Sequence, residues 1–204
     1  GLFGNVKQTD LTAVNNILHV LNIVAPQLQI SYSDNADDVN LPIHFANCTK
    51  RFSELVNDCK GKYAGLFYHS HNRFDEAKFG WIWVDSQYGR STREHILIHE
   101  LGHAIGLGHN LCRYSVMSYA DYADSVPYFT EIDLMQLRLL YDQKLRDNMY
   151  SYQVIEELEL NKEIYSEYDS NKKPMCSPQQ SGWKGLVDFQ KGLKTVEEIL
   201  NEGN

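Results

Sequence analysis

The sequence predicts an α+β domain in which a mixed, twisted sheet packs against helices. Four short β-like runs lie between stretches with helical periodicity, an order that suits this fold class. The 204 residues are enough for one domain with a substantial core, and the apolar share of 43% is ordinary for a globular protein. No apolar run approaches the roughly 18 residues that a membrane span needs. The net charge of −8 would repel nucleic acid and acidic membranes, so we expect neither as a partner.

The first predicted element is a helix that begins at Thr9 or Asp10 and ends before Pro26. Either residue can cap a helix N-terminus. One apolar stripe follows at helical spacing: Leu11, Val14, Ile17, Leu18 and Leu21. The four β-like runs come next, at residues 28–33, 41–47, 63–70 and 81–86. The polar stretch "DNADDVN" between the first two runs predicts a turn.

Two further helices are expected after the runs. Ser91 and Glu94 have capping-box spacing and predict a helix that ends near Gly106, since two glycines in three residues favour a turn. Another helix should begin at Thr130, with Asp133 three residues later.

The composition changes near Asn148. We therefore expect residues 1–147 to form the main domain and residues 148–204 a helical C-terminal appendage. Apolar residues in this appendage recur in steps of three and four: Leu186, Phe189, Leu193, Val196 and Leu200. Packing is the favoured explanation of this stripe, ahead of a partner-binding face.

The segment "HELGHAIGLGH" at residues 99–109 predicts a metal site. His99 and His103 are four residues apart, so on a helix they lie on one face, while Glu100 points to the side. His109 can join them only if the chain turns back, and Gly106 permits the positive φ that such a turn requires. Three imidazoles with one open position are typical of catalytic zinc. Glu100 would then be the general base for a water molecule that the metal activates.

Chance is the alternative explanation of these histidines. A bare H-E-x-x-H is only moderate evidence for a metal, and the G-x-x-H extension makes coincidence much rarer.

The segment after the histidines extends the pattern to a known family. Met117 lies eight residues after His109, within "YSVMSY". The sequence resembles the metzincin clan of zinc endopeptidases, whose signature is H-E-x-x-H-x-x-G-x-x-H followed by a methionine turn. "YSVMSY" is most similar to the turn of the serralysin group. The short spacing to the turn, "FTEIDLMQLRLLY" and "LQISYSDNADDVNLPIHF" resemble the matrixins, and the resemblance covers about residues 9–145.

The resemblance implies a metzincin-like fold with an active-site helix, and it assigns roles to residues of the motif. His99, His103 and His109 would bind Zn²⁺, with Glu100 as the catalytic base. Met117 would form an apolar floor beneath the metal. Tyr119 would be an additional ligand that moves away to donate to the oxyanion of the substrate. The first matrixin strand is missing or reduced to "LFGNV", and calcium loops are not evident, so we expect no calcium.

The resemblance also implies an enzyme that cuts peptide bonds in proteins or peptides. The substrate would lie extended along an edge strand at residues 64–70. Metzincins without an obvious prodomain are often secreted, and bacterial ones include effectors that cut host proteins, such as the actin-cleaving RavK. We therefore expect a monomer that is secreted, either extracellular or delivered into a host cell. A protein-binding module that retains zinc without turnover is the alternative, although the intact Glu100 argues against it.

Other signals are weaker. His69 and His71 lie near Asp75, where matrixins hold a second zinc, but exposed histidines are the favoured explanation. His95 is expected to be an ordinary helix histidine. Trp81 and Trp83 share one face of a strand, which favours a core over a substrate platform.

The four cysteines leave the redox state open. They are Cys48, Cys59, Cys112 and Cys176. Two disulfides are compatible with this count, for example Cys48–Cys59 and Cys112–Cys176, and so are four reduced thiols.

Overall fold

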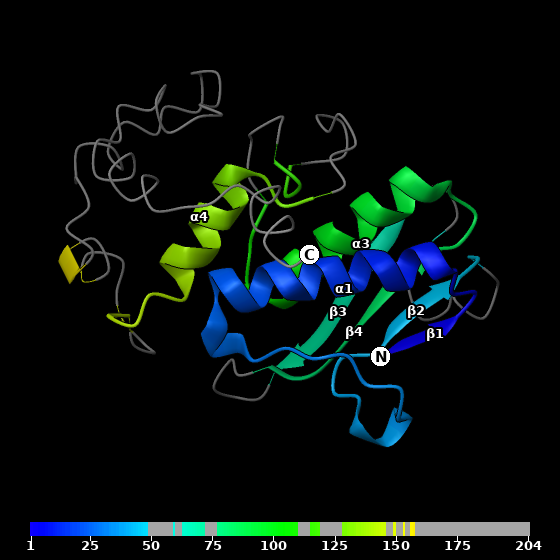
Figure 1. Cartoon of the computed structure of the whole chain (residues 1–204), viewed down its shortest axis with the longest axis horizontal. Helices are drawn as coiled ribbons and strands as arrows, with labels where there is room; N and C mark the ends of the chain where they lie inside the picture. Colours follow the sequence, from blue (N-terminus) through cyan, green and yellow to red (C-terminus); the bar gives the residue numbers. More distant parts are fainter. Residues whose placement is uncertain are drawn as a thin grey trace.

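A computed structural model describes residues 1–48, 59, 63–71, 77–109, 115–118, 128–145, 149, 153, 156 and 157, with only the backbone at 71, 77, 78, 131 and 135. The strands are β1 (Leu2–Gly4), β2 (Ile43–Ala46), β3 (Gly65–His71) and β4 (Ala77–Asp85). The helices are α1 (Gln8–Val24), α3 (Arg90–Ala104) and α4 (Glu131–Leu140), with short 3-10 turns at Pro26–Leu28 and Ala36–Asp38 (Figure 1). Nearly all of the appendage expected at 148–204 lies outside the described residues.

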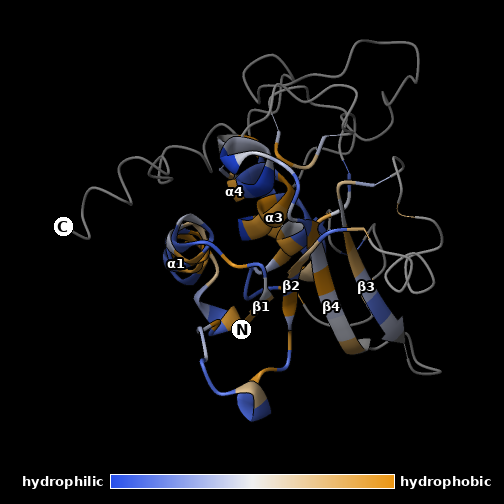
Figure 2. Cartoon of the chain, turned by 90° about the vertical axis from the view of Figure 1, so that its right-hand side faces the viewer, coloured by the Kyte–Doolittle hydropathy of each residue, from blue (hydrophilic) through white to orange (hydrophobic). Residues whose placement is uncertain are grey.

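The four strands form one sheet with parallel and antiparallel neighbours, and such a mixed sheet was expected from the sequence. Their order is β1-β2-β4-β3, and β1, β2 and β4 are parallel. β3 runs antiparallel to β4 and forms an edge of the sheet, which places the expected edge strand at Gly65–His71. Helices α1, α3 and α4 lie on one side of the sheet (Figure 2).

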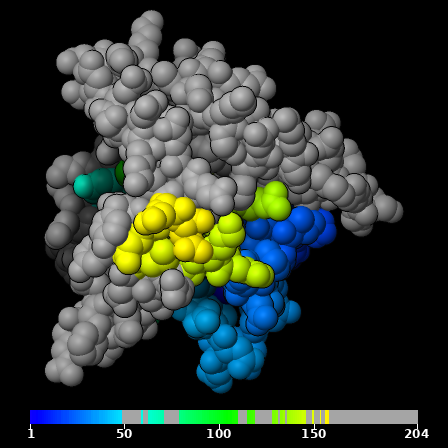
Figure 3. Space-filling model, turned by 90° about the vertical axis from the view of Figure 1, so that its left-hand side faces the viewer, coloured from blue at the N-terminus to red at the C-terminus, as the bar shows by residue number. Residues whose placement is uncertain are grey.

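The main core fills the space between these helices and the sheet. The stripe on α1 is buried at Val14, Ile17 and Leu21, as its spacing predicts. The facing core residues from the sheet and α3 are Ile43, Phe45, Ile82, Val84, Ile96, Leu97 and Leu101. α4 lies beside α1 (Figure 3), and the side chain of Gln27 donates to the carbonyl of Tyr141 at 2.7 Å. No helix in the described part of the chain is long and apolar enough to cross a bilayer.

A buried ion pair fixes α3 against α1. The guanidinium of Arg93 binds the carboxylate of Asp10 through two nitrogens, and both side chains are almost fully buried. Arg93 also donates to the carbonyls of Ser86 (3.2 Å) and Asn5 (3.1 Å), and its charge lies 4.8 Å from the ring centre of Phe45. A buried charge is tolerated only when its partners are this complete, so the pair fixes one orientation of the two helices.

The segment at residues 28–33 is not a strand, so this prediction was wrong. The backbone of Ile30 is hydrogen-bonded to a side chain and not to a neighbouring strand. The side chain of Asn22 accepts from the Ile30 amide (3.1 Å) and donates to the Ile30 carbonyl (2.8 Å). Gln29 has a φ of 47°, which breaks the extended conformation. The stretch "LFGNV" does supply a first strand, β1, reduced to three residues.

The predicted cap of the active-site helix was also wrong. α3 begins at Arg90 with Gly89 as its N-cap, and no side chain caps it. Glu94 instead pairs with Arg90 at 2.8 Å. The predicted start of the last helix is confirmed, since Thr130 is the N-cap of α4 and forms a capping box with Asp133 at the third position.

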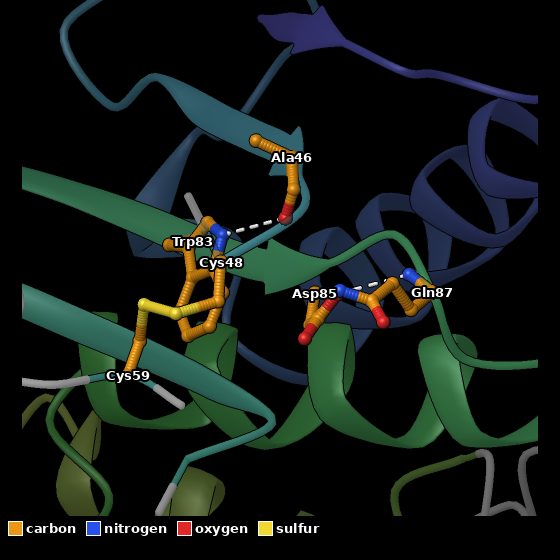
Figure 4. The surroundings of a disulfide bond; sticks show 6 residues. All are labelled: Ala46, Cys48, Cys59, Trp83, Asp85 and Gln87. Carbon is orange, nitrogen blue, oxygen red and sulfur yellow. Dashed lines mark hydrogen bonds between the residues drawn. A yellow bond between two sulfur atoms is a disulfide. The ribbon is translucent and has the colours of Figure 1, made fainter. Parts of the chain in front are cut away.

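The face of the sheet opposite the helices carries a disulfide. Cys48 and Cys59 are bonded beside the indole of Trp83, whose Nε1 donates to the carbonyl of Ala46 at 2.9 Å (Figure 4). Trp83 is fully buried, which confirms it as a core residue. The structure thus pairs Cys48 with Cys59, one of the alternatives that the sequence left open, and Cys112 and Cys176 lie outside the described residues.

Candidate metal centre

Three histidines meet at the C-terminal end of α3. His99 and His103 lie one turn apart on this helix, which ends at Ala104. Gly106 follows with a φ of 93°, a conformation that favours glycine, and reverses the chain. The amide of Gly106 donates to the carbonyl of His103 at 3.0 Å, which closes the turn and brings His109 back over the helix. The predicted role of Gly106 is confirmed.

The Nε2 atoms of the three rings form a nearly equilateral triangle. They are 3.1 Å apart between His99 and His109, and 3.2 Å apart in the pairs that include His103. Tetrahedral zinc with Zn–N bonds of about 2.0–2.1 Å requires its ligand nitrogens about 3.3–3.4 Å apart, so the triangle fits this ion. Within the described residues, no other group of three His, Cys, Asp or Glu side chains is close enough to hold one metal ion.

Two backbone carbonyls determine which ring nitrogen faces the centre of the triangle. Nδ1 of His99 donates to the carbonyl of Val116 at 2.7 Å, and Nδ1 of His103 donates to that of Leu107 at 2.8 Å. In the neutral form of these two rings the proton is therefore on Nδ1, and the lone pair of Nε2 points toward the centre of the triangle. Burial lowers the pKa of His99 to about 4, which keeps this ring neutral. Converging lone pairs of neutral imidazoles are the donor set that zinc prefers.

Glu100 lies beside the histidines in a buried position. Its Oε2 accepts from the amide of Phe67 on β3 at 2.7 Å. Burial raises the pKa of Glu100 to about 7, against the opposing effect of the Phe67 hydrogen bond. Gly65 makes this close packing of α3 on β3 possible, because a Cβ there would lie 2.2 Å from Cγ2 of Ile96 and 3.2 Å from Cγ of Glu100.

The methionine turn at residues 115–118 packs beneath α3. Met117 is fully buried, and its sulfur lies against Gly102 on the helix. The turn is closed by the amide of Met117, which donates to Oγ of Ser115 at 2.9 Å, and by the amide of Ser118, which donates to the carbonyl of Ser115 at 3.2 Å. The apolar floor expected of Met117 is thus in contact with the helix that carries the histidines.

Asp133 on α4 anchors this turn, a role that the sequence analysis missed. Its fully buried carboxylate accepts from the amide of Val116 (3.1 Å), the amide of Thr130 (2.8 Å), the hydroxyl of Thr130 (2.7 Å) and the hydroxyl of Ser115. Val116 in turn presents the carbonyl that orients His99. The capping-box spacing identified Asp133 as a helix cap only, and no local pattern indicates its contact with a residue 17 positions earlier.

The remaining candidates do not join the centre in the part of the chain that the structure describes. His69 is exposed and stacks on Phe67 with ring centres 5.0 Å apart. The side chain of His71, together with Asp75 and Tyr119, lies outside what is described. His95 is a neighbour of His99 on α3, with ring centres 6.1 Å apart, and is not one of the three converging rings.

Comparison with known proteins agrees with this geometry. The sequence model of a family described as Matrixin matches residues 6–141, which is more than half of the chain. A protein of Trichoplusia ni ascovirus 2c named "Putative matrix metalloproteinase" is 26% identical over 180 residues. That match covers 78% of this chain and 36% of the viral protein, so the chain spans little more than a third of this relative's length. No solved structure matches the chain significantly.

Replacing Asp133 with Asn should weaken zinc binding by about 10- to 100-fold, the usual cost of losing support behind a metal ligand. Asn keeps the volume but offers one acceptor oxygen. With that oxygen on the amides of Val116 and Thr130, its NH₂ group faces Oγ of Ser115, whose hydroxyl loses its acceptor. Competition with a chelator measures the zinc affinity, and circular dichroism checks the fold. Asp142→Asn is the matched control, because Asp142 accepts from the Lys144 amide (2.9 Å) away from the turn. Unchanged zinc affinity in folded Asp133→Asn would show that Asp133 does not support the site.

Proposed function

Because this chain belongs to the matrixin family of zinc metallopeptidases, we propose that it is an endopeptidase that hydrolyses peptide bonds in proteins or peptides. The observation that carries this proposal is the convergence of the three Nε2 atoms beside a buried carboxylate with a raised pKa. A purely structural zinc site is usually closed by four protein ligands, whereas three leave a position open for chemistry.

The proposal assigns His99, His103 and His109 as the zinc ligands and Glu100 as the catalytic base. Bound zinc supplies Lewis acidity, which activates water and polarises the carbonyl of the scissile bond. Glu100 takes the proton of the attacking water and returns it to the nitrogen of the leaving amine. A carboxyl group with a pKa of about 7 can do both near neutral pH, because neither transfer is strongly uphill.

The edge strand β3 is the proposed binding site for an extended substrate. β3 pairs with β4 on one side, and its Phe67 amide points instead toward α3 and Glu100. A peptide that pairs with such an edge gains backbone hydrogen bonds, while pockets for alternate side chains select sequence. The scissile bond would then lie beside the base and the three histidines.

Glu100→Gln should abolish proteolysis while zinc remains bound, since the base is not a ligand. We expect turnover of a peptide substrate to fall by at least about a hundredfold, the contribution of a general base. Metal analysis after dialysis should find one zinc per chain in both proteins, and His103→Ala should lose it. Near-normal turnover in Glu100→Gln would assign the base to another residue. Zinc binding by a wild-type protein that cuts no peptide would favour the binding module instead.

Tyr119 follows the methionine turn directly and is the proposed donor to the oxyanion that forms on the scissile carbonyl. Tyr119→Phe keeps the ring and removes only the hydroxyl. We expect the turnover rate to fall by roughly ten- to a thousandfold, the range for losing one such donor. Zinc content and thermal unfolding should stay almost unchanged, because the three histidines remain. An unchanged turnover rate would reduce Tyr119 to a packing role.

A more specific proposal concerns the compartment in which the enzyme acts and the protein that it cuts. We propose a monomer that is secreted or delivered into a host cell and cuts a host protein such as actin. The Cys48–Cys59 disulfide supports an oxidising compartment, since disulfides are rare in the cytosol. Matrix proteins are the competing proposed substrates, because the viral relative is named "Putative matrix metalloproteinase".

Residues 148–204 are proposed to choose the protein substrate and to add nothing to the chemistry, which residues 1–147 would provide. Truncation near Asn148 should therefore spare cleavage of a short peptide and impair cleavage of the native target. Cleavage-site proteomics on a host-cell lysate, with Glu100→Gln as the inactive control, identifies that target and compares the two lengths. A truncated protein that folds but cannot cut even a short peptide would place the tail in the active site.

A further inference from the structure

Gly102 occupies a position on α3 where a glycine has no conformational reason to be. It lies between Leu101 and His103 in the last turn of the helix and is buried. The glycines with positive φ in the described part of the chain are Gly4 and Gly106, so Gly102 keeps an ordinary helical backbone. Glycine is less favourable than alanine inside a helix. The reason for this glycine must therefore be the space that its missing side chain leaves.

Met117 fills that space. A Cβ on Gly102 would lie 2.3 Å from Sδ and 3.1 Å from Cε of Met117, and 3.7 Å from Cδ1 of Leu107. The first distance is far below any real contact between carbon and sulfur. Met117 is completely buried, so its thioether cannot move aside into solvent. Adding a methyl group in a packed interior forces side chains and backbone to shift.

Both carbonyls that orient the zinc ligands lie next to this contact. Val116, the neighbour of Met117, accepts from Nδ1 of His99 at 2.7 Å. The carbonyl of Gly102 itself accepts from the amide of Leu107 at 2.9 Å, and the carbonyl of Leu107 accepts from Nδ1 of His103 at 2.8 Å. A shift of the turn at residues 115–118 would therefore move the group that fixes the ring of His99.

We propose that Gly102 is a positioning residue for the zinc site. Because Gly102 has no side chain, Met117 can pack directly against α3. This contact keeps the carbonyl of Val116 in the place where it accepts from His99. This inference rests on the proposed zinc-binding function. Alanine is unsuitable at position 102 because its methyl group would clash with Met117, and the backbone freedom of glycine plays no part.

A double-mutant cycle on the full chain tests the proposal. Gly102→Ala should raise the zinc dissociation constant, measured by chelator competition, by about 10- to 100-fold. Met117→Ala removes Sδ and Cε, the two atoms that would lie too close to the new methyl group. In that background, adding Gly102→Ala should change the zinc dissociation constant by no more than about twofold, as for uncoupled sites. An effect of helix propensity alone would be the same in both backgrounds.

Gly108→Ala is the matched control, because a Cβ there would meet no described atom within 4 Å. It should leave zinc affinity unchanged. If Gly102→Ala does not fold, recovery of folding in the double variant supports the proposal, and continued misfolding overturns it. Wild-type zinc affinity in folded Gly102→Ala, or an equal loss in both backgrounds, overturns the proposal while the proposed function stands. A wild-type protein that binds no zinc overturns both.

Discussion

One constraint governs the rest of the structure, which is that the Nε2 atoms of three histidines converge on one point. The Nε2 atoms of His99, His103 and His109 lie within 3.2 Å of one another. The carbonyls of Val116 and Leu107 fix the tautomer and direction of two rings, so these rings do not have to reorient when metal arrives. A preorganised site loses little conformational entropy on binding, which increases its affinity.

The elements that carry these carbonyls and the histidines are held in place by buried charged side chains as well as by apolar contacts. Asp133 on α4 holds the turn that carries Val116, and the Arg93–Asp10 pair holds α3 against α1. Both carboxylates are buried and receive several donors, and removal of one partner would leave an unpaired charge in the interior. Such groups tolerate fewer arrangements than an apolar contact does. The hydrogen bonds of these two carboxylates therefore fix the positions of α3 and of the turn at residues 115–118 more closely than apolar contacts alone would.

Most features that depend on neighbouring residues in the chain could be predicted from the sequence, and the cap of α3 is an exception. The spacing of the histidines, the reversal at Gly106 and the capping box of α4 involve residues within a few positions of each other. The segment at 28–33 could not be predicted, because Asn22 on α1 takes up the backbone of Ile30 in a contact that no local periodicity reveals. The hydrogen bonds of Asp133 to the methionine turn and the pairing of Cys48 with Cys59 could not be predicted for the same reason, since both depend on how the chain folds in three dimensions.

The proposed catalytic base, Glu100, is bonded directly to the proposed substrate edge, β3. The carboxylate of Glu100 is bonded to the amide of Phe67, and the absence of a side chain at Gly65 lets α3 pack directly on the same strand. A shift of β3 along its axis would therefore lengthen or break the hydrogen bond that orients the carboxylate of Glu100. A peptide that pairs with β3 takes its register from the backbone that also positions Glu100, so the bond to be cut is set within the domain. This arrangement is compatible with the proposal that residues 148–204 choose the protein substrate, because the proposed base and the substrate edge are aligned by contacts within residues 1–147.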